Sequence, residues 1–418
     1  MQIRATSPIL LLAGVLACAS SPRGQNGRPS PIAEYQGDVS VKPASRRLDA
    51  TWDIRLAELD ASRDSVVFLL NAGFDLPEVT GDGVRSVNAR VEDDLRTISV
   101  HFDTSRTIAT RRLIRIRYTG VPHFSTDSIN NIGETWTELA LDSFWLPIVS
   151  DFAHAMTARM RLKLPADWKV VSSGHVTASS EGLEVRQDVA LIDIPFVASP
   201  LLQQFGDSRV TIFHTGADST RLFQVQRAAT RCSEHLDARF GSTYPLPPVK
   251  IVLAPRAGPG YARKNFIVIT QLRDTASAPL TYFLCHEVSH FWSSGANAIG
   301  PENWINEGFA EYVAGREVGI QFGDSAFAKI LGNWKSGAEG QPPVWDATLT
   351  KRPSERVAYC KAPALLAELE TRIGSATMER FLRDVLRSRL ATTTEVLTAL
   401  RRHAGKETAV WFQGKLAL

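Results

Sequence analysis

Two neighbouring segments, LCHEVSH at residues 284–290 and NWINEGFAEY at residues 303–312, indicate where the chemistry of this chain lies. Both segments fall in stretches with a helical pattern of apolar residues. His286 and His290 are four positions apart, so on a helix both imidazoles point to the same side and can reach one cation. Zn²⁺ prefers a tetrahedral set of nitrogen, sulfur or oxygen ligands, and a catalytic site keeps one position open. The first segment therefore predicts two ligands of a zinc site.

Two carboxylates fit the rest of such a site. Glu287 follows His286 directly, which places it beside the open position as a general base and not as a ligand. Glu307 supplies a third ligand if a short loop joins the two helices. Glu311 lies one turn further along the same helical pattern, and spacing alone does not separate these two carboxylates.

The composition of the whole chain is that of a globular protein. The 418 residues are 44% hydrophobic and 22% charged, and this length predicts two or three domains. A formal net charge of +3 without a long basic run argues against nucleic acid as a partner. Four cysteines are too few for a disulfide scaffold.

The N-terminus is typical of an export signal. Arg4 precedes a short apolar stretch at 9–16, and residues 1–18 are predicted to be a signal peptide ending at a lipobox cysteine, Cys18. Cleavage at the small residues around Cys18, for plain secretion, is the alternative. Residues 19–34 are expected to form a flexible tether. We therefore expect an exported protein: a bacterial cell-envelope lipoprotein, or otherwise a periplasmic or secreted protein, with membrane contact only through the lipid.

The rest of the chain divides into two parts of different pattern. Residues 35–204 show short runs of period-two alternation between turn residues, which predicts an all-β, sandwich-like domain. Residues 205–418 contain a few buried strand candidates among helical patterns, so the fold class is expected to be α+β. The predicted helices lie near 220–240 and at 279–293, 303–317, 323–335, 355–373, 375–388 and 393–404.

Three segments together resemble one family of zinc peptidases, the gluzincins that include membrane alanyl aminopeptidases and leukotriene-A4 hydrolases. The segments are HEVSH at 286–290, WINEGFA at 304–310 and YCKA at 359–362. The resemblance implies a β domain followed by a thermolysin-like, mainly helical domain that hydrolyses peptide substrates with one zinc ion per chain. By motif position it makes His286, His290 and Glu307 the ligands and Glu287 the base. Tyr359 then stabilises the oxyanion.

The chain departs from the family pattern in three ways. Sixteen residues separate His290 from Glu307, where the family usually has 18, and we expect the family's large C-terminal helical domain to be absent or reduced to a few helices. The family's Gly-x-Met-Glu-Asn segment, whose Glu binds the substrate's free amine, corresponds to residues 258–265, which hold no carboxylate. Arg263 and Lys264 stand there instead, either as cations that repel an N-terminus or as solvated edge charges.

The substrate-binding residues that the resemblance suggests are Gly260, Tyr261 and Glu138. Glu138 lies near the position of a substrate-binding Gln in the family and is suggested as a substitute for the missing acid. The expected activity is therefore that of a zinc metallopeptidase, aminopeptidase-like but without the amine anchor. A zinc endopeptidase, a dipeptide-releasing enzyme and a catalytically silent envelope protein stapled by zinc are the alternatives. The oligomeric state is left open.

The remaining cysteines and aromatics are expected to be core residues. Cys285 and Cys360 flank the catalytic segments and are predicted to be small buried hydrophobes, with a disulfide between them as the alternative. Cys232 is assigned to the core of a helix. Trp304 and Phe309 are expected to be core aromatics that fix the helix carrying Glu307.

Overall fold

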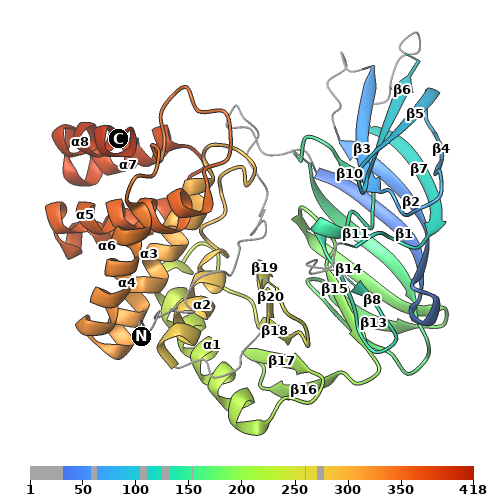
Figure 1. The fold of residues 1–418 in the computed structure, drawn as a ribbon, viewed down its shortest axis with the longest axis horizontal. Helices are drawn as coiled ribbons and strands as arrows, with labels where there is room; N and C mark the ends of the chain where they lie inside the picture. The colour runs from blue at the N-terminus through green and yellow to red at the C-terminus, as the bar shows by residue number, and fades with distance from the viewer. Residues whose placement is uncertain are drawn as a thin grey trace, which may run out of the picture.

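The computed structural model describes residues 32–57, 64–103, 111–124, 131–152, 154–258, 260–270 and 277–418. The predicted signal peptide, Cys18 and residues 19–31 of the predicted tether lie outside these ranges. Figure 1 shows two parts, a β-rich half formed by the first half of the chain and a helical half formed by the second. The predicted α+β class, a β domain followed by a mainly helical one, is confirmed. No helix in the described ranges has both the length and the apolar character needed to cross a bilayer.

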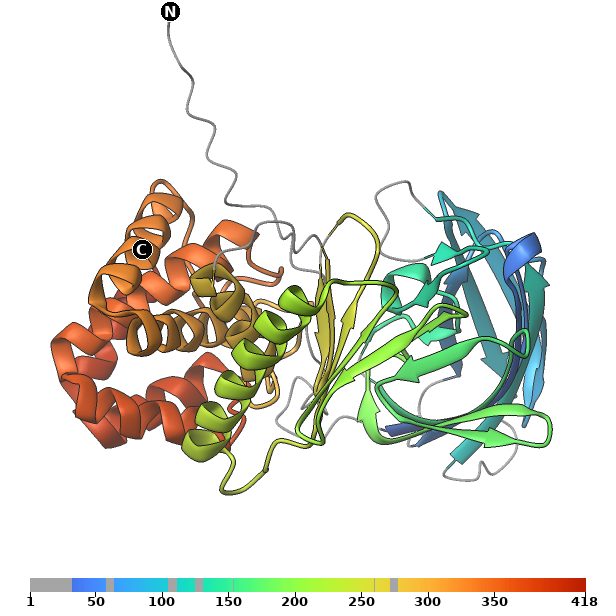
Figure 2. The same ribbon diagram turned by 90° about the horizontal axis from the view of Figure 1, so that it is seen from below.

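The N-terminal half is built from three antiparallel or mixed sheets. Their orders are β13-β14-β11-β1-β2-β7-β4, β10-β3-β6-β5 and β12-β15-β9-β8. Figure 2 shows the largest sheet curving around the outside of this half. The strands are β1 (Ile32–Lys42), β2 (Arg47–Ala57), β3 (Ser65–Asn71), β4 (Glu78–Gly81), β5 (Val84–Glu92), β6 (Leu95–Phe102), β7 (Arg111–Gly120), β8 (Asn131–Ile132), β9 (Thr137–Leu139), β10 (Ile148–Val149), β11 (Ala155–Lys163), β12 (Lys169–Ser172), β13 (His175–Ser179), β14 (Gly182–Leu191) and β15 (Phe196–Ser199).

Period-two alternation produces the core of this half. Along β1, every second residue from Ala33 is buried, so one face of the strand packs inward and the other meets solvent. Trp52 on β2 is fully buried, and its ring occupies the space that a Cβ at Gly37 of the paired strand would need. Trp145 stacks edge-on against Trp52 at 5.8 Å. The alternating sequence therefore specifies both the strands and the face that each one buries.

The C-terminal half begins with a five-stranded sheet of order β16-β17-β18-β20-β19. Its strands are β16 (Gln203–Gly206), β17 (Val210–His214), β18 (Val249–Leu253), β19 (Tyr261–Arg263) and β20 (Phe266–Ile269), and helix α1 (Ser219–Phe240) connects β17 to β18 in parallel. Ile251 and Ile267 face the core of the helices, whereas Val252 and Val268 pack against the β domain. Strands β18 and β20 are therefore buried on both faces, between the helices and the first domain (Figure 2), whereas the edge strand β16 is largely exposed.

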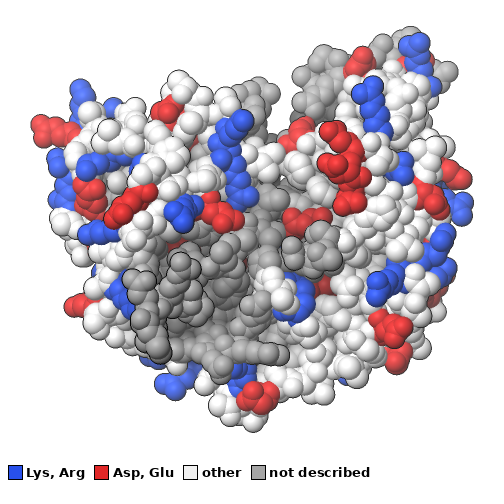
Figure 3. Space-filling view, in the orientation of Figure 1, with Lys and Arg blue, Asp and Glu red and all other residues white. Residues whose placement is uncertain are grey.

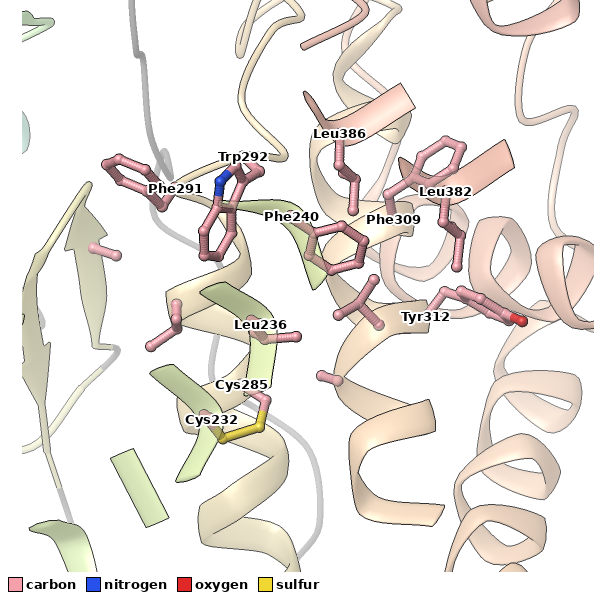
Figure 4. Packing of buried hydrophobic residues seen from close by; sticks show 14 of the residues in the cluster. Cys232, Leu236, Phe240, Cys285, Phe291, Trp292, Phe309, Tyr312, Leu382 and Leu386 are labelled. Atoms are coloured by element: carbon pink, nitrogen blue, oxygen red, sulfur yellow. A yellow bond between two sulfur atoms is a disulfide. The ribbon is translucent and has the colours of Figure 1, made fainter. Parts of the chain in front are cut away.

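The helices of this half pack together around a single apolar core. They are α2 (Ser277–Ser289), α3 (Asn303–Phe322), α4 (Asp324–Ala338), α5 (Ala362–Ile373), α6 (Ser375–Arg387), α7 (Thr393–Ala404) and α8 (Lys406–Leu416), with the π-helical turn η3 (Val357–Lys361) leading into α5. Figure 4 shows Phe240, Trp292, Phe309 and Leu386 meeting in this core. Strand β19 and helix α8 have no counterpart in the sequence-based prediction.

Charged side chains of both signs are spread over the face of the molecule seen in Figure 1. Figure 3 shows Lys and Arg interspersed with Asp and Glu on both the helical and the β-rich half. This distribution fits a chain with 47 basic and 44 acidic residues. The described residues of this face therefore present a mixed charge and not a wide field of one sign.

The cysteine pairing differs from both expectations. Cys232 on α1 and Cys285 on α2 form a disulfide with a Cα–Cα distance of 5.2 Å, and Cys360 is a buried free thiol (Figure 4). Cys232, Cys285 and Cys360 are all buried, as predicted, but the pairing of Cys232 with Cys285 was not predicted, and the alternative Cys285–Cys360 pair was wrong. The reason is the face of the helix: Cys285 points to α1, whereas Cys360 packs on α4 at Gly337. Order along the chain does not show which face a cysteine takes.

Candidate active site

The two histidines and Glu307 converge from two packed helices. His286 lies in the last turn of α2, His290 in the turn that follows it, and Glu307 in the first turns of α3. The two Nε2 atoms are 3.0 Å apart, and Glu307 Oε2 lies 3.7 Å from that of His286 and 3.3 Å from that of His290. The ligand atoms of all three residues lie within 4.8 Å of one another. The structure thus brings together the three side chains that the motif predicted as a set.

Hydrogen bonds in the connecting loop hold α3 in place beside α2. The hydroxyl of Ser293 donates to the carbonyl oxygens of Ile305 and Asn306, and the Asn306 side chain accepts from the amide of Ala296 and donates to its carbonyl. Gly308 lets α3 approach α5, because a Cβ there would lie 2.7 Å from Ala362 Cβ. These contacts fix Glu307 although the loop is shorter than the family spacing.

Core aromatics support the same helix from the other side. Trp304 and Phe309 belong to α3 and are fully buried, which confirms the prediction that they are core aromatics of the helix that carries Glu307. The indole of Trp304 also donates to the hydroxyl of Thr393 at the start of α7. The C-terminal helices therefore help to position the α3 ligand.

The outer nitrogens of the two histidines both face oxygen atoms. His290 Nδ1 is hydrogen-bonded to the carbonyl oxygen of Ser293 at 3.2 Å, whereas His286 Nδ1 lies 2.9 Å from Glu311 Oε1 in a close contact without hydrogen-bond geometry. Such partners orient an imidazole so that its other nitrogen faces a metal. Glu311 is in turn held by the hydroxyl of Tyr282 and, at 3.3 Å, by the indole of Trp334. The geometry thus separates the two carboxylates of α3: Glu307 faces the Nε2 atoms, and Glu311 supports His286 from behind.

The electrostatics of the three converging residues suit a divalent cation. Burial lowers the pKa of His286 to about 3, so its imidazole is neutral and has a free lone pair. Burial acts to raise the pKa of Glu307, but the nearby charge of His290 outweighs it and the pKa falls to about 2. Glu307 Oε2 is buried without a hydrogen-bond partner in the described ranges. Two imidazole nitrogens and one carboxylate oxygen are a donor set that fits Zn²⁺.

Glu287 lies next to this cluster but outside it. Its side chain is buried, and Oε2 has no hydrogen-bond partner among the described residues. Burial raises its pKa to about 7, assisted by the charge of Glu307 and opposed by His290 and Arg263. A carboxyl group with a pKa near neutrality can both accept and return a proton. Its environment is therefore suited to general acid–base chemistry.

Tyr359 lies over the ring of His286. It is part of η3, and the two rings stack with centroids 5.8 Å apart and planes at 25°. Burial and the nearby charge of Glu307 raise the pKa of Tyr359 well above 10, so the phenol keeps its proton and can donate a hydrogen bond. The structure thus places the predicted oxyanion residue beside the predicted ligands.

The edge strand β19 corrects the expectation for Arg263. This residue is neither a free cation in the cleft nor a solvated edge charge. Its fully buried guanidinium pairs with both carboxylate oxygens of Asp193, at 2.7 and 3.1 Å. Asp193 belongs to the β domain, so the pair joins the two domains. Lys264 forms the turn to β20 with a positive φ of 58°.

The three residues suggested for substrate binding lie where the domains meet. Glu138 is fully buried, and Arg256 binds both its oxygens at 2.6 and 2.8 Å, while the Trp136 indole donates at 3.1 Å. Tyr261 is 1% exposed and packs with Trp136 in a small apolar cluster. A Cβ at Gly260 would meet the carbonyl oxygen of Val268 at 2.5 Å. Both oxygens of Glu138 already accept hydrogen bonds from protein groups, so neither is free to bind a substrate amine.

Sequence reasoning missed several contacts around the site. The predicted residues are surrounded by Tyr282, Trp334, Asp193 and Arg352, which no motif indicated, and by Glu311, which was considered only as an alternative ligand. Only Glu311 carried a sequence signal, its position one turn after Glu307. The others come from distant parts of the chain, and nothing local identifies them.

Comparison with known proteins shows the fold. No family model and no curated protein sequence matches the chain, but solved structures do. The M1 zinc metallopeptidase from Deinococcus radiodurans is 16% identical, covers 92% of this chain and 93% of its own, and has a TM-score of 0.67. A point mutant of that enzyme, solved with a bound Tyr-Ser-Ala substrate, gives the same values. Native leukotriene A4 hydrolase from Saccharomyces cerevisiae is 17% identical over 92% of this chain and 67% of its own, with a TM-score of 0.69.

Proposed function

We propose that this protein is a zinc metallopeptidase that hydrolyses peptide bonds. The observation that carries the proposal is the convergence of His286, His290 and Glu307 to within 4.8 Å, with the carboxyl group of Glu287 beside them. A structural zinc site needs neither a base nor a tyrosine next to it, so Glu287 and Tyr359 speak against a silent, zinc-stapled protein. The fold shared with M1 zinc metallopeptidases, one of which is solved with a peptide substrate, supports the same class.

The roles of the residues follow from their surroundings. His286, His290 and Glu307 would hold the zinc ion, which supplies a Lewis acid that polarises the substrate carbonyl. Glu287 accepts a proton from the attacking water and passes it to the leaving amine. Tyr359 donates its hydroxyl proton in a hydrogen bond to the oxyanion, an effect typically worth about 3 kcal/mol.

Substitution of the base tests the proposal. Glu287→Gln keeps the shape of the side chain but cannot take up a proton. We expect kcat/KM on a fluorogenic peptide library to fall by roughly 10²–10⁴ while the zinc content of the purified protein stays unchanged. Glu339→Gln, an exposed position, is the matched control and should behave as wild type.

Three results would count against this function. Unchanged turnover in Glu287→Gln would exclude that residue as the base. Wild-type protein with one zinc per chain and no cleavage of any peptide would favour the silent protein. Wild-type protein purified without bound zinc would show that the three residues do not form a zinc site.

An endopeptidase or dipeptide-releasing activity is the second candidate, and the state of the amine anchor favours it. Arg263 stands on the strand where the related family carries a Glu, and both oxygens of Glu138 are bound by Arg256. We expect N-acetylated and free-amine peptides of the same sequence to be cleaved at similar rates. A strict requirement for the free amine would instead show a true aminopeptidase with an anchor elsewhere.

We also propose that the chain is exported, with Cys18 as a lipidated N-terminus. The signal-like residues 1–18 support this, and so does the Cys232–Cys285 disulfide, since such bonds persist in oxidising compartments. Intact-mass measurement of the mature protein tests it. A mature chain that starts at Cys18 with an added lipid is the expected result, and an unmodified N-terminus elsewhere would refute the lipoprotein assignment.

A further inference from the structure

An arginine lies beside the predicted metal ligands and has no part in the proposed chemistry. Arg352 belongs to the loop between α4 and η3, and its Nη2 atom is 3.9 Å from Glu307 Oε1. Its side chain is 28% exposed, so the guanidinium contacts both the site and solvent. Its charge also acts on Tyr359, where it opposes the rise of the pKa. Arg352 is therefore close to both the ligand and the predicted oxyanion residue.

The loop that carries Arg352 is anchored at several points. At its start, Lys361 Nζ donates to the carbonyl oxygens of Gln341 and Pro342 at 2.8 and 2.9 Å. In its middle, the indole of Trp345 donates to Glu302 at the N-terminus of α3. Pro353 follows Arg352 and restricts its backbone to extended conformations. Anchoring of the loop reduces the conformational entropy that is lost when a side chain on it binds a ligand.

The guanidinium of Arg352 lacks a committed partner, unlike the two arginines at the domain boundary. Arg256 and Arg263 each bind two carboxylate oxygens within hydrogen-bonding distance. Among the described residues, the only carboxylate within 4 Å of Arg352 belongs to Glu307, at a distance too long for a hydrogen bond. In the proposed enzyme the charge of Glu307 is committed to zinc. The five N–H donors of Arg352 then remain available to the substrate.

We infer that Arg352 is a specificity-determining residue that binds a carboxylate of the peptide substrate. The inference rests on the proposed peptidase function and extends it to a substrate class. A guanidinium presents a planar fork that matches a carboxylate through two parallel hydrogen bonds. Its place beside Glu307 puts the bound carboxylate near the scissile bond. The carboxylate comes either from an acidic side chain or from the C-terminus of a short peptide.

A binding experiment separates these sources. Three peptides of equal length are compared on zinc-loaded Glu287→Gln protein by calorimetry: a neutral peptide with a C-terminal amide, the same peptide with Glu in place of Gln, and the same peptide with a free C-terminus. We expect one of the two acidic peptides to bind about tenfold more tightly than the neutral one, since a hydrogen bond to a charged group is worth about 1.5 kcal/mol or more. The peptide that shows the preference identifies the source.

Variants of the loop then assign the preference to Arg352. Arg352→Gln should bring the ratio of dissociation constants close to one, and Arg352→Lys, which keeps the charge but loses the fork, should leave an intermediate ratio. Lys351→Gln removes the same charge from the exposed neighbouring position and should keep the preference.

The outcomes that overturn the inference differ from those that overturn the function. Cleavage of peptides by the wild type with no preference for an acidic peptide, or a preference that survives in Arg352→Gln, overturns the inference alone. Failure of all three peptides to bind, together with no cleavage by the wild type, overturns the peptidase function and the inference with it.

Discussion

The disulfide between α1 and α2 gives a prediction whose magnitude follows from the chain. Cys232 and Cys285 are 53 residues apart, so the bond closes a long loop in the unfolded state. In the chain-entropy model, a disulfide that closes a loop of this length lowers the conformational entropy of the unfolded state, which raises the free energy of that state by about 4 kcal/mol at 25 °C. Replacing both cysteines by alanine should therefore lower the free energy of unfolding by about that amount.

Urea denaturation measures this loss. A domain of this size has an m-value of roughly 2–3 kcal/mol per molar urea, so the midpoint should fall by about 1.3–2 M. Wild-type protein unfolded under reducing conditions should show a similar shift. Cys360→Ala is the matched control, because it removes a buried thiol that closes no loop, and it should cost about 1 kcal/mol. A double variant that is no less stable than this control would refute the entropic reasoning.

Two further predictions concern stability. Asp193→Ala leaves the guanidinium of Arg263 buried without a countercharge and should lower the free energy of unfolding by about 3–5 kcal/mol. Asp188→Ala, at an exposed position, is the control and should not lower it. Equal thermal midpoints of the two variants would contradict this prediction. Burial lowers the pKa of His214, whose Nδ1 accepts hydrogen bonds from two backbone amides. As the pH falls below about 6.5, this imidazole therefore takes up a proton more readily in the unfolded chain than in the folded one, and the free energy of unfolding decreases. His214→Asn should therefore flatten the pH dependence of unfolding between pH 6.5 and 5, and an unchanged slope would contradict the assignment.

Local patterns predicted the architecture of the molecule well. Period-two alternation predicted the β domain, and the helical pattern at 393–404 agrees with α7 at both ends. The pattern at 303–317 also begins where α3 begins. These signals are readable because a residue's burial follows from its position within one element. The i and i+4 spacing of His286 and His290 belongs to the same class of local information.

Contacts between residues far apart in the sequence could not be predicted from local patterns. Cys285 is bonded to Cys232 on α1, Arg263 pairs with Asp193 in the other domain, and Arg352 lies near Glu307 although a loop carries it. In each case the sequence shows the residue type but not the direction in which the side chain points. Arg263 was expected to be either repulsive or solvated, and a partner 70 positions away decides that it is neither.

An anomalous difference map at the zinc absorption edge, from crystals of the purified protein, would show whether His286, His290 and Glu307 bind zinc. We expect one peak per chain, about 2.0–2.2 Å from the Nε2 atoms of His286 and His290 and from an oxygen of Glu307. A map without a peak there, or with the metal held by other residues, would contradict it.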